Sequence, residues 1–125
     1  MVVTKGKKKH RFTKVKASYP VVVLTADGPV EGETQHITPQ ETFVRCRDPL
    51  RLYDIASLSI KVSKHESLLA EGEVVLSNRY GPDDEITPRG MTVRFINLSA
   101  RDRLRLRTLI ARHYQRKVRQ IAGEA

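Results

Sequence analysis

Residues 89–110 read RGMTVRFINLSARDRLRLRTLI, and the spacing of their apolar side chains changes part-way along. At first the side chains alternate, with Met91, Val93 and Phe95 on one face. Alternation with a period of two is typical of a strand that is buried on one side. Further along, apolar residues recur every three or four positions, which is typical of an amphipathic helix. The segment therefore predicts a strand that leads directly into a helix.

The expected helix covers about residues 99–122. Ser99 and Asp102 have the spacing of a capping box, with Asp102 in place of the usual glutamate. Gly123 is expected to end the helix. Its apolar stripe consists of Leu104, Leu106, Leu109, Ile110, His113, Val118 and Ile121. We expect this stripe to pack on the rest of the domain, and the part from about His113 onward to project beyond it.

Five more stretches upstream have strand character. They are YPVVVL (19–24), ETQHI (33–37), ETFVRC (41–46), SLSIKVS (57–63) and LLAEGEVVLSNR (68–79). TADGPVEG (25–32) is expected to be a turn, because Asp-Gly favours tight reversal. Gly72 is expected to mark a bulge or a close approach of two strands. Short strands followed by one helix predict a mainly β fold: a small six-stranded antiparallel β-barrel with a long C-terminal helix.

The length of 125 residues suits a single domain with one core. We expect a flexible basic N-terminal arm over residues 1–9, since lysines dominate it and apolar periodicity is missing. The domain itself is expected over residues 10–122, with its barrel over about 18–97.

The composition is strongly basic, with a net charge of +9 and a pI of about 10.1. Such a balance predicts attraction to anions, whether nucleic acid, phosphate ligands, acidic protein surfaces or anionic lipid, and a solvated basic surface explains it equally well. Cys46 is the single cysteine, so an intramolecular disulfide is excluded, and we expect a buried, inert thiol. The first residues lack the long apolar stretch typical of a signal peptide, and no segment approaches the ~20 apolar residues needed to span a bilayer. A cytoplasmic protein is expected.

No catalytic signature is present. The sequence lacks GxxxxGK[ST], GxGxxG, GxSxG and HExxH. The four histidines are scattered without an i, i+4 pair, so no metal site is predicted. The acidic cluster Asp83-Asp84-Glu85 lies between two prolines and is expected to be a solvated loop rather than a catalytic carboxylate pair. We therefore expect a non-enzymatic protein without a cofactor.

The order of these segments resembles a PilZ domain, over about residues 8–112. The clearest part is residues 89–110, which resembles the last strand and helix of that family. EGEVVLS (71–77) resembles the long strand before it, and KHRFTKVKASYPVVV (9–23) resembles the basic approach to the first strand. Most PilZ domains are bacterial receptors for cyclic di-GMP, which they hold with the motifs R-x-x-x-R and [D/N]-x-S-x-x-G.

Carried onto this chain, the first motif falls on HRFTK (10–14). His10 and Lys14 stand at the two arginine positions, with Arg11 between them. Arginine offers a fixed fork of donors to phosphate oxygens and guanine edges, and lysine does not. A register that starts at Arg11 places Val15 at the second arginine and fits less well.

The second motif falls on HITPQE (36–41). His36 replaces the acid or amide, Thr38 keeps the hydroxyl of the serine, and Glu41 replaces the glycine. Glu41 adds bulk and negative charge beside a dianionic ligand, and it is expected to resist a positive φ at a cost of about 1 kcal/mol or more. Loss of the two arginine guanidinium groups, at ~1.5–3 kcal/mol per charged contact, would weaken the binding of cyclic di-GMP by orders of magnitude. A plainer interpretation makes His36 and Glu41 two polar surface residues.

Three functions remain open. The first is a PilZ-type adaptor in bacterial motility or surface-behaviour signalling, which acts through a protein partner and binds cyclic di-GMP weakly or not at all. Its candidate contacts are the helix arginines Arg101, Arg105, Arg112, Arg116 and Arg119, with Phe12, Tyr19 and Tyr53 as anchors or as core residues. The second is a functional cyclic di-GMP receptor whose basic arm becomes ordered on ligand binding. The third is a nucleic-acid-binding small β-barrel, which is disfavoured because aromatic and basic residues are not interleaved.

Overall fold

The computed structural model describes the backbone of residues 15–124 and the side chains of residues 15–116. The predicted arm over residues 1–9 lies outside the described residues. In the described part, the elements are β1 (Val15–Lys16), β2 (Pro20–Thr25), β3 (Gly28–Ile37), β4 (Glu41–Cys46), β5 (Ile55–Lys61), β6 (Ser67–Asn78), β7 (Gly90–Leu98) and helix α2 (Ala100–Glu124).

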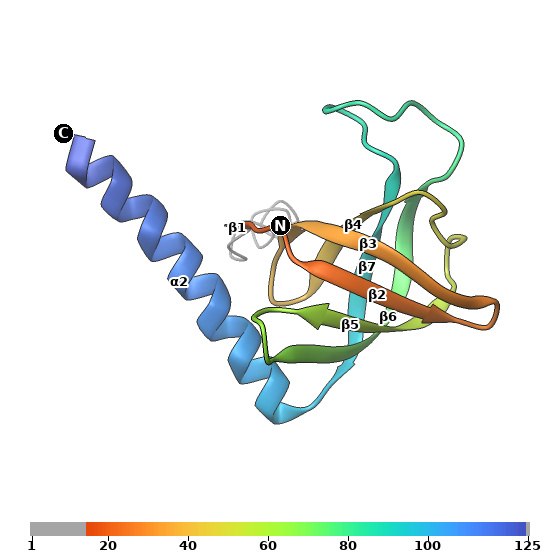
Figure 1. Ribbon diagram of the computed structural model, residues 1–125, viewed down its shortest axis with the longest axis horizontal. Helices are drawn as coiled ribbons and strands as arrows, with labels where there is room; N and C mark the ends of the chain where they lie inside the picture. The colour runs from red at the N-terminus through yellow and green to blue at the C-terminus, as the bar shows by residue number, and fades with distance from the viewer. Residues whose placement is uncertain (1–14, 125) are drawn as a thin grey trace, which may run out of the picture.

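Strands β2 to β7 form a closed antiparallel barrel, with β1 as an extra strand beside β3 (Figure 1). The strands follow the order β3, β2, β5, β6, β7, β4, and pairing between β3 and β4 closes the ring. The barrel with a C-terminal helix that the sequence predicts is confirmed.

Alternating side chains fill the barrel. Leu58 and Ile60 of β5 and Met91 and Val93 of β7 are buried, as their alternation predicts. The other strands contribute Val21, Val23, Ile37, Val44, Leu68 and Val74. Each such side chain stabilises the fold by about 1.5–3 kcal/mol, so this interior supplies much of the driving force for folding.

The turn between β2 and β3 is much shorter than predicted. Thr25 pairs with Gly28, so Ala26 and Asp27 alone form the turn, and most of the stretch predicted as a turn belongs to β3. Gly28 has a φ of 114°, which suits glycine. The Thr25 hydroxyl donates to the Gly28 carbonyl at 2.7 Å. The prediction was wrong because cross-strand pairing with β2 outweighs the weak strand propensity of Gly, Pro and Glu.

Gly72 marks both a bulge and a close approach, as predicted. The register between β6 and β7 shifts between Glu71 and Gly72. A Cβ atom at Gly72 would overlap the Val93 side chain and lie 3.0 Å from the Arg94 carbonyl oxygen.

Helix α2 begins as predicted, since the Asp102 amide donates to Ser99 Oγ at 3.0 Å. Leu106 and Ile110 are buried against the barrel. Leu104 is 66% exposed, so its place in the predicted stripe was wrong. Residues two positions apart are about 200° apart around a helix, so Leu104 and Leu106 cannot share a face.

The far end of α2 extends beyond the barrel, as the ribbon shows (Figure 1). Its helical conformation continues through Gly123 to Glu124, so Gly123 does not end it. The side chains of Val118 and Ile121 lie outside the described residues.

Candidate ligand site on the barrel wall

Strand β1 brings the N-terminal segment to the second motif. Val15 pairs with Ile37 and Lys16 pairs with His36. The described chain therefore begins, at Val15, beside the end of β3. His10, Arg11 and Lys14 themselves lie outside the described residues.

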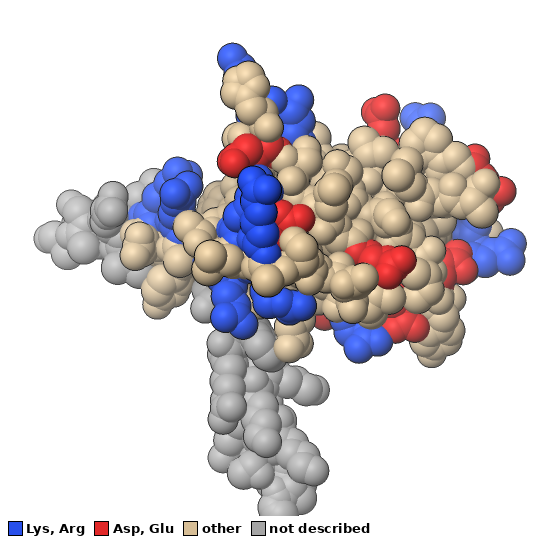
Figure 2. Space-filling view, turned by 90° about the horizontal axis from the view of Figure 1, so that it is seen from below, with Lys and Arg blue, Asp and Glu red and all other residues tan. Residues whose placement is uncertain are grey.

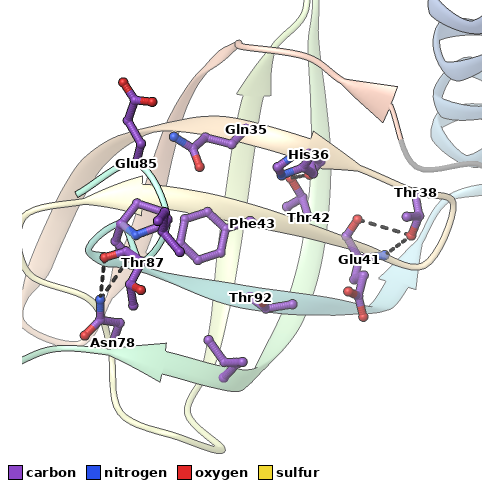
Figure 3. Close-up of a pocket in the computed structure, with 13 residues that line it drawn as sticks. Gln35, His36, Thr38, Glu41, Thr42, Phe43, Asn78, Glu85, Thr87 and Thr92 are labelled. Carbon is purple, nitrogen blue, oxygen red and sulfur yellow. Dashed lines mark hydrogen bonds between the residues drawn. The ribbon is translucent and has the colours of Figure 1, made fainter. Parts of the chain in front are cut away.

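A cavity of about 320 Å³ opens on the outer wall of the barrel next to this point. It lies between the ends of β3 and β4, the neighbouring strands and the loop over residues 79–89 (Figure 3). Thr38 and Glu41 are at one end, Asn78 and Thr87 at the other, with Phe43 between them. The lining residues are Gln35, His36, Thr38, Glu41, Thr42, Phe43, Leu76, Asn78, Glu85, Ile86, Thr87, Pro88 and Thr92. The three described positions of the predicted motif thus line one cavity.

A bulge between Thr34 and His36 sets the His36 side chain at this cavity. Two residues of β3 there oppose one residue of β4, which redirects side chains, so Gln35 and His36 both line the cavity. The Thr42 hydroxyl donates to the His36 carbonyl at 2.9 Å and holds the bulge in place. Sequence reasoning missed Gln35, because strict alternation would send it to the face opposite His36.

Thr38 holds the turn between β3 and β4. Its hydroxyl oxygen accepts from the amides of Gln40 at 3.1 Å and Glu41 at 3.0 Å. The Thr38 amide donates to the Glu41 carbonyl at 2.9 Å. This is the hydroxyl-capped turn that Ser and Thr favour. Thr38 is 9% exposed, so its first role is to position Glu41.

Glu41 begins β4 in ordinary strand geometry and pairs with Arg94. Among the described residues other than glycine, Tyr53 has a positive φ, of 72°, and Glu41 does not. Glu41 therefore carries no strain of this kind, because pairing with β7 keeps its backbone extended. Glu41 and Glu85 are both among the residues that line the cavity. Within the described lining there is no lysine or arginine.

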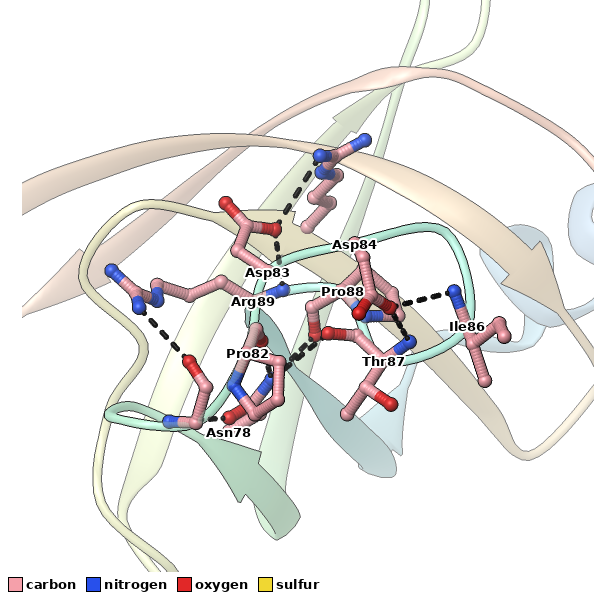
Figure 4. Close-up of polar contacts among 10 residues, drawn as sticks. Asn78, Pro82, Asp83, Asp84, Ile86, Thr87, Pro88 and Arg89 are labelled. Carbon is pink, nitrogen blue, oxygen red and sulfur yellow. Dashed lines mark hydrogen bonds and ion pairs between the residues drawn. The ribbon is translucent and has the colours of Figure 1, made fainter.

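The loop over residues 79–89 forms one wall, and Asn78 organises it. Asn78 Nδ2 donates to the carbonyls of Pro82 at 2.9 Å and Pro88 at 3.0 Å (Figure 4). Asn78 Oδ1 accepts from the Gly81 amide at 3.0 Å. One amide side chain thus fixes both ends of the loop. Asparagine before Gly and Pro is a turn signal that sequence reasoning could have used.

The acidic cluster in this loop is more ordered than predicted. Asp84 Oδ1 accepts from the amides of Ile86 at 2.9 Å and Thr87 at 2.7 Å. Asp83 accepts from the Arg89 amide at 2.9 Å and forms an ion pair with Arg45 at 3.4 Å (Figure 4). The Arg89 amide, followed by the charge of Arg45, lowers the pKa of Asp83. Only part of the cluster is simply solvated, since the carboxylates of Asp83 and Asp84 accept hydrogen bonds from backbone amides of the loop.

The candidate partner-binding arginines occupy one side of α2. At about 100° per residue, positions 101, 105, 112, 116 and 119 fall within a sector of about 60°. Arg105 pairs with Asp102 at 2.9 Å and with Glu66 at 3.4 Å. No ion pair is found for Arg101, Arg112 or Arg116 in the described part of the chain. The Arg119 side chain lies outside that part.

The aromatic candidates have different environments. Tyr19 is half-buried, with its ring against His113 of α2. Tyr53 is 69% exposed. Phe12 lies outside the described residues. Tyr53 is thus the one of the two described candidates that a partner could reach.

A family model described as the PilZ domain matches residues 7–112. The chain belongs to the PilZ domain family. The matched residues include all of β7 and the first half of α2.

Solved PilZ structures share this fold. The PilZ domain of YcgR from Escherichia coli, solved with c-di-GMP, is similar with a TM-score of 0.70 at 12% identity, over 92% of this chain and 98% of that chain. The Bacillus subtilis inhibitor of motility (MotI/DgrA) gives 0.67 at 17% identity, over 87% of this chain. The PilZ domain of CeSA, from a cellulose-synthesizing bacterium, gives 0.54 at 21% identity, over 78% of this chain and 93% of that chain.

The chain spans about half the length of the inhibitor of motility, 51% of that protein. No curated protein matched the sequence. Among the described side chains of this PilZ domain, no three His, Cys, Asp or Glu residues are grouped as a metal site. Likewise, α2 is not apolar enough to cross a membrane over its described residues.

Proposed function

We propose that this protein is a non-enzymatic PilZ-type regulator in bacterial motility or surface-behaviour signalling. It acts through contacts with a protein partner and binds cyclic di-GMP weakly or not at all. Membership of the PilZ family supports the general role, and similarity to an inhibitor of motility supports the process. YcgR, whose PilZ domain was solved with c-di-GMP, supplies the ligand against which this site is compared.

The observation that carries the proposal is the charge of the cavity. Glu41 and Glu85 line it, and its described lining contains no lysine or arginine. Cyclic di-GMP carries two negative phosphates, so these carboxylates oppose it. The motif that would supply compensating cations falls on residues 10–14, where His10 and Lys14 stand at its two arginine positions. Lysine gives a point charge without the bidentate fork, which weakens phosphate recognition.

Isothermal titration with cyclic di-GMP at physiological salt tests this proposal directly. We expect no saturable heat at high micromolar ligand. A variant with His10→Arg, Lys14→Arg, His36→Asp and Glu41→Gly restores the motifs and should gain binding. Lys61→Arg with Lys64→Arg adds two arginines on the β5–β6 side and is the matched control, for which no gain is expected. A micromolar or tighter constant for the unmodified protein would overturn the proposal.

A functional cyclic di-GMP receptor is the second candidate, and the pairing of β1 with β3 favours it. This pairing places Val15 and Lys16, where the described chain begins, beside the end of β3 and next to the cavity that His36 and Thr38 line. Arg11 and Lys14 would then contact the phosphates. If the titration shows binding, Arg11→Ala with Lys14→Ala should abolish it, whereas Lys61→Ala with Lys64→Ala should leave it unchanged.

A further inference from the structure

Another hollow lies between α2 and the turn that joins β5 to β6. It is a groove of about 310 Å³, lined from the barrel by Val62, Ser63, Glu66 and Leu68 and from the helix by Leu104, Arg105, Thr108, Leu109 and Arg112. The helix wall from residue 104 to residue 112 is about 12 Å long, at 1.5 Å per residue. A short peptide segment could therefore lie along it.

The groove has an apolar floor and an apolar lip. Leu68 is buried at its base, and Val62 and Leu109 are half-buried beside it. Leu104 stands at the lip with 66% of its surface exposed. The Thr108 hydroxyl donates to the Leu104 carbonyl at 3.0 Å, so it is already satisfied within the helix. The groove thus offers apolar contact without requiring a polar group deep inside.

Two arginines of α2, Arg105 and Arg112, line the groove. Arg105 is held at one end by Asp102 and Glu66, and it ties the helix to the barrel turn. Arg101, Arg112 and Arg116 lie in the same sector of α2, and none has an ion-pair partner in the described part of the chain. Their charge is therefore available to a ligand.

The charge of the chain is unevenly divided. Residues 100–124 contain eight Lys and Arg against two Asp and Glu, whereas residues 15–99 contain nine against twelve. Lys and Arg side chains gather over the first part of α2, whereas both signs are mixed over the barrel (Figure 2). Clustered charge of one sign attracts the opposite sign and sets the rate and register of association.

We propose that this groove binds an acidic amphipathic segment of a partner protein. An aliphatic or aromatic side chain of the segment enters between Leu104 and Val62, and its Asp or Glu carboxylates pair with Arg112, Arg116 and Arg101. Apolar anchoring with charged pairs at the rim is how helices and short peptides dock in grooves. The inference rests on the proposed function, because it specifies the chemistry of the protein partner.

Other anionic partners fit the shape less well. Leu104 and Tyr114, the large exposed apolar residues of the described helix surface, are about 80° apart and form no continuous apolar face for a bilayer. The described lining of the groove contains no aromatic side chain on which a nucleic-acid base could stack. A second copy of this chain could present its acidic barrel wall instead, so self-association is measured as well.

The test uses the full chain and a fluorescent synthetic peptide of Glu and Leu, with leucines at helical spacing, followed by fluorescence anisotropy at physiological salt. We expect saturable binding that falls about tenfold or more in Arg112→Glu with Arg116→Glu. Arg103→Glu with Arg107→Glu is the matched control, because it makes the same charge change on the opposite side of α2. That control should keep its affinity within about twofold, since exposed charges beyond a Debye length are screened.

The apolar contribution is tested separately. Replacing the peptide leucines by serine, or Leu104→Ser in the protein, should each weaken binding several-fold. Circular dichroism confirms that each variant keeps its fold. Equal losses in the two charge-reversal variants, or unchanged binding of the serine peptide, would overturn the proposal in favour of unspecific attraction.

Further measurements test whether a membrane, a nucleic acid or a second copy of this chain binds the groove instead. Tighter binding of phosphatidylserine vesicles or of a single-stranded oligonucleotide than of the peptide, with the same dependence on Arg112 and Arg116, would overturn it. The proposal would also be overturned if sedimentation showed concentration-dependent dimers and the variant Arg112→Glu with Arg116→Glu were monomeric. Cyclic di-GMP is titrated into the same samples. If neither the peptide nor cyclic di-GMP binds, the proposal for the groove is rejected and the proposed function is not. Tight binding of cyclic di-GMP rejects the proposed function.

Discussion

The Tyr19 hydroxyl lies 2.6 Å from Nε2 of His113, and their rings meet edge to face with centroids 5.9 Å apart. Tyr19 immediately precedes β2, whereas His113 is in the middle of α2. The contact joins the helix to the segment just before β2. Burial, followed by the nearby charge of Arg116, lowers the pKa of His113 from its ordinary 6.5.

This contact predicts a pH dependence of stability. The folded protein resists protonation of His113, whereas in the unfolded chain the residue titrates near its ordinary pKa. The unfolded state therefore binds more protons as the pH falls through about 6.5, and stability decreases in that direction. The contribution of this contact to stability is fully present above about pH 6.5. Thermal unfolding between pH 7.5 and 5.5 should show a falling midpoint.

His113→Gln is the control for this effect, since glutamine does not titrate but can still meet the Tyr19 hydroxyl. The variant should show a flatter profile over the same range. An equally steep profile would assign the dependence to other groups. Tyr19→Phe, which removes the hydrogen bond, should cost about 0.5–1.5 kcal/mol at neutral pH.

The two faces of α2 predict unequal costs for two leucine truncations. Leu106→Ala removes a side chain that is 1% exposed, and it should destabilise the protein by about 2–5 kcal/mol. Leu104→Ala changes a side chain that is 66% exposed, and it should alter stability by less than about 0.5 kcal/mol. Urea denaturation measures both. Similar costs would contradict the observed helix orientation.

Asn78→Ala should loosen the loop over residues 79–89 without unfolding the barrel. The variant loses the donor to Pro82 and Pro88 and the acceptor for Gly81, at about 1 kcal/mol for each net hydrogen bond. Faster amide exchange confined to this loop, measured by mass spectrometry, is the expected result. Ser77→Ala, at the neighbouring position, should not affect the loop. Unchanged exchange in Asn78→Ala would show that backbone contacts suffice.

Cys46 should react slowly with thiol reagents. Burial, followed by the charge of Asp48, raises the pKa of its thiol to about 11, so little thiolate exists at pH 8. Ellman's reagent should modify the native protein far more slowly than the protein in guanidinium chloride. Equal rates in the two conditions would mean that the β4 region opens readily.

Several features were predictable because they depend on residues close together in the chain. Alternation at Leu58 and Ile60 predicts a strand whatever its partner is, and the Ser99 cap needs only the next turn of the helix. The positions of the motif at His36, Thr38 and Glu41 also followed from local order, and the structure brings all three to one cavity.

Other features depended on pairing with distant residues. The extent of β3 is set by β2, since Gly28, Pro29 and Glu31 have little strand preference of their own. The bulge at Gln35 exists only in the pairing with β4, and no local pattern indicates it. The sequence did not show that Leu104 points away from the barrel. Spacing alone predicts an apolar stripe, but it does not tell which residues at the edges of that stripe are buried.

The sequence by itself determined the class of fold, the start of the helix and the family, because these follow from short-range periodicity, capping and motif order. Tertiary structure decided which side chains meet. The cavity joins β3 and β4 to a loop more than thirty positions further along the chain, and the groove joins Leu104 and Arg112 to Val62. Such sites arise from the closure of the barrel and the docking of α2 on it. The free energy of those contacts belongs to pairs of distant segments, and neither segment encodes it alone.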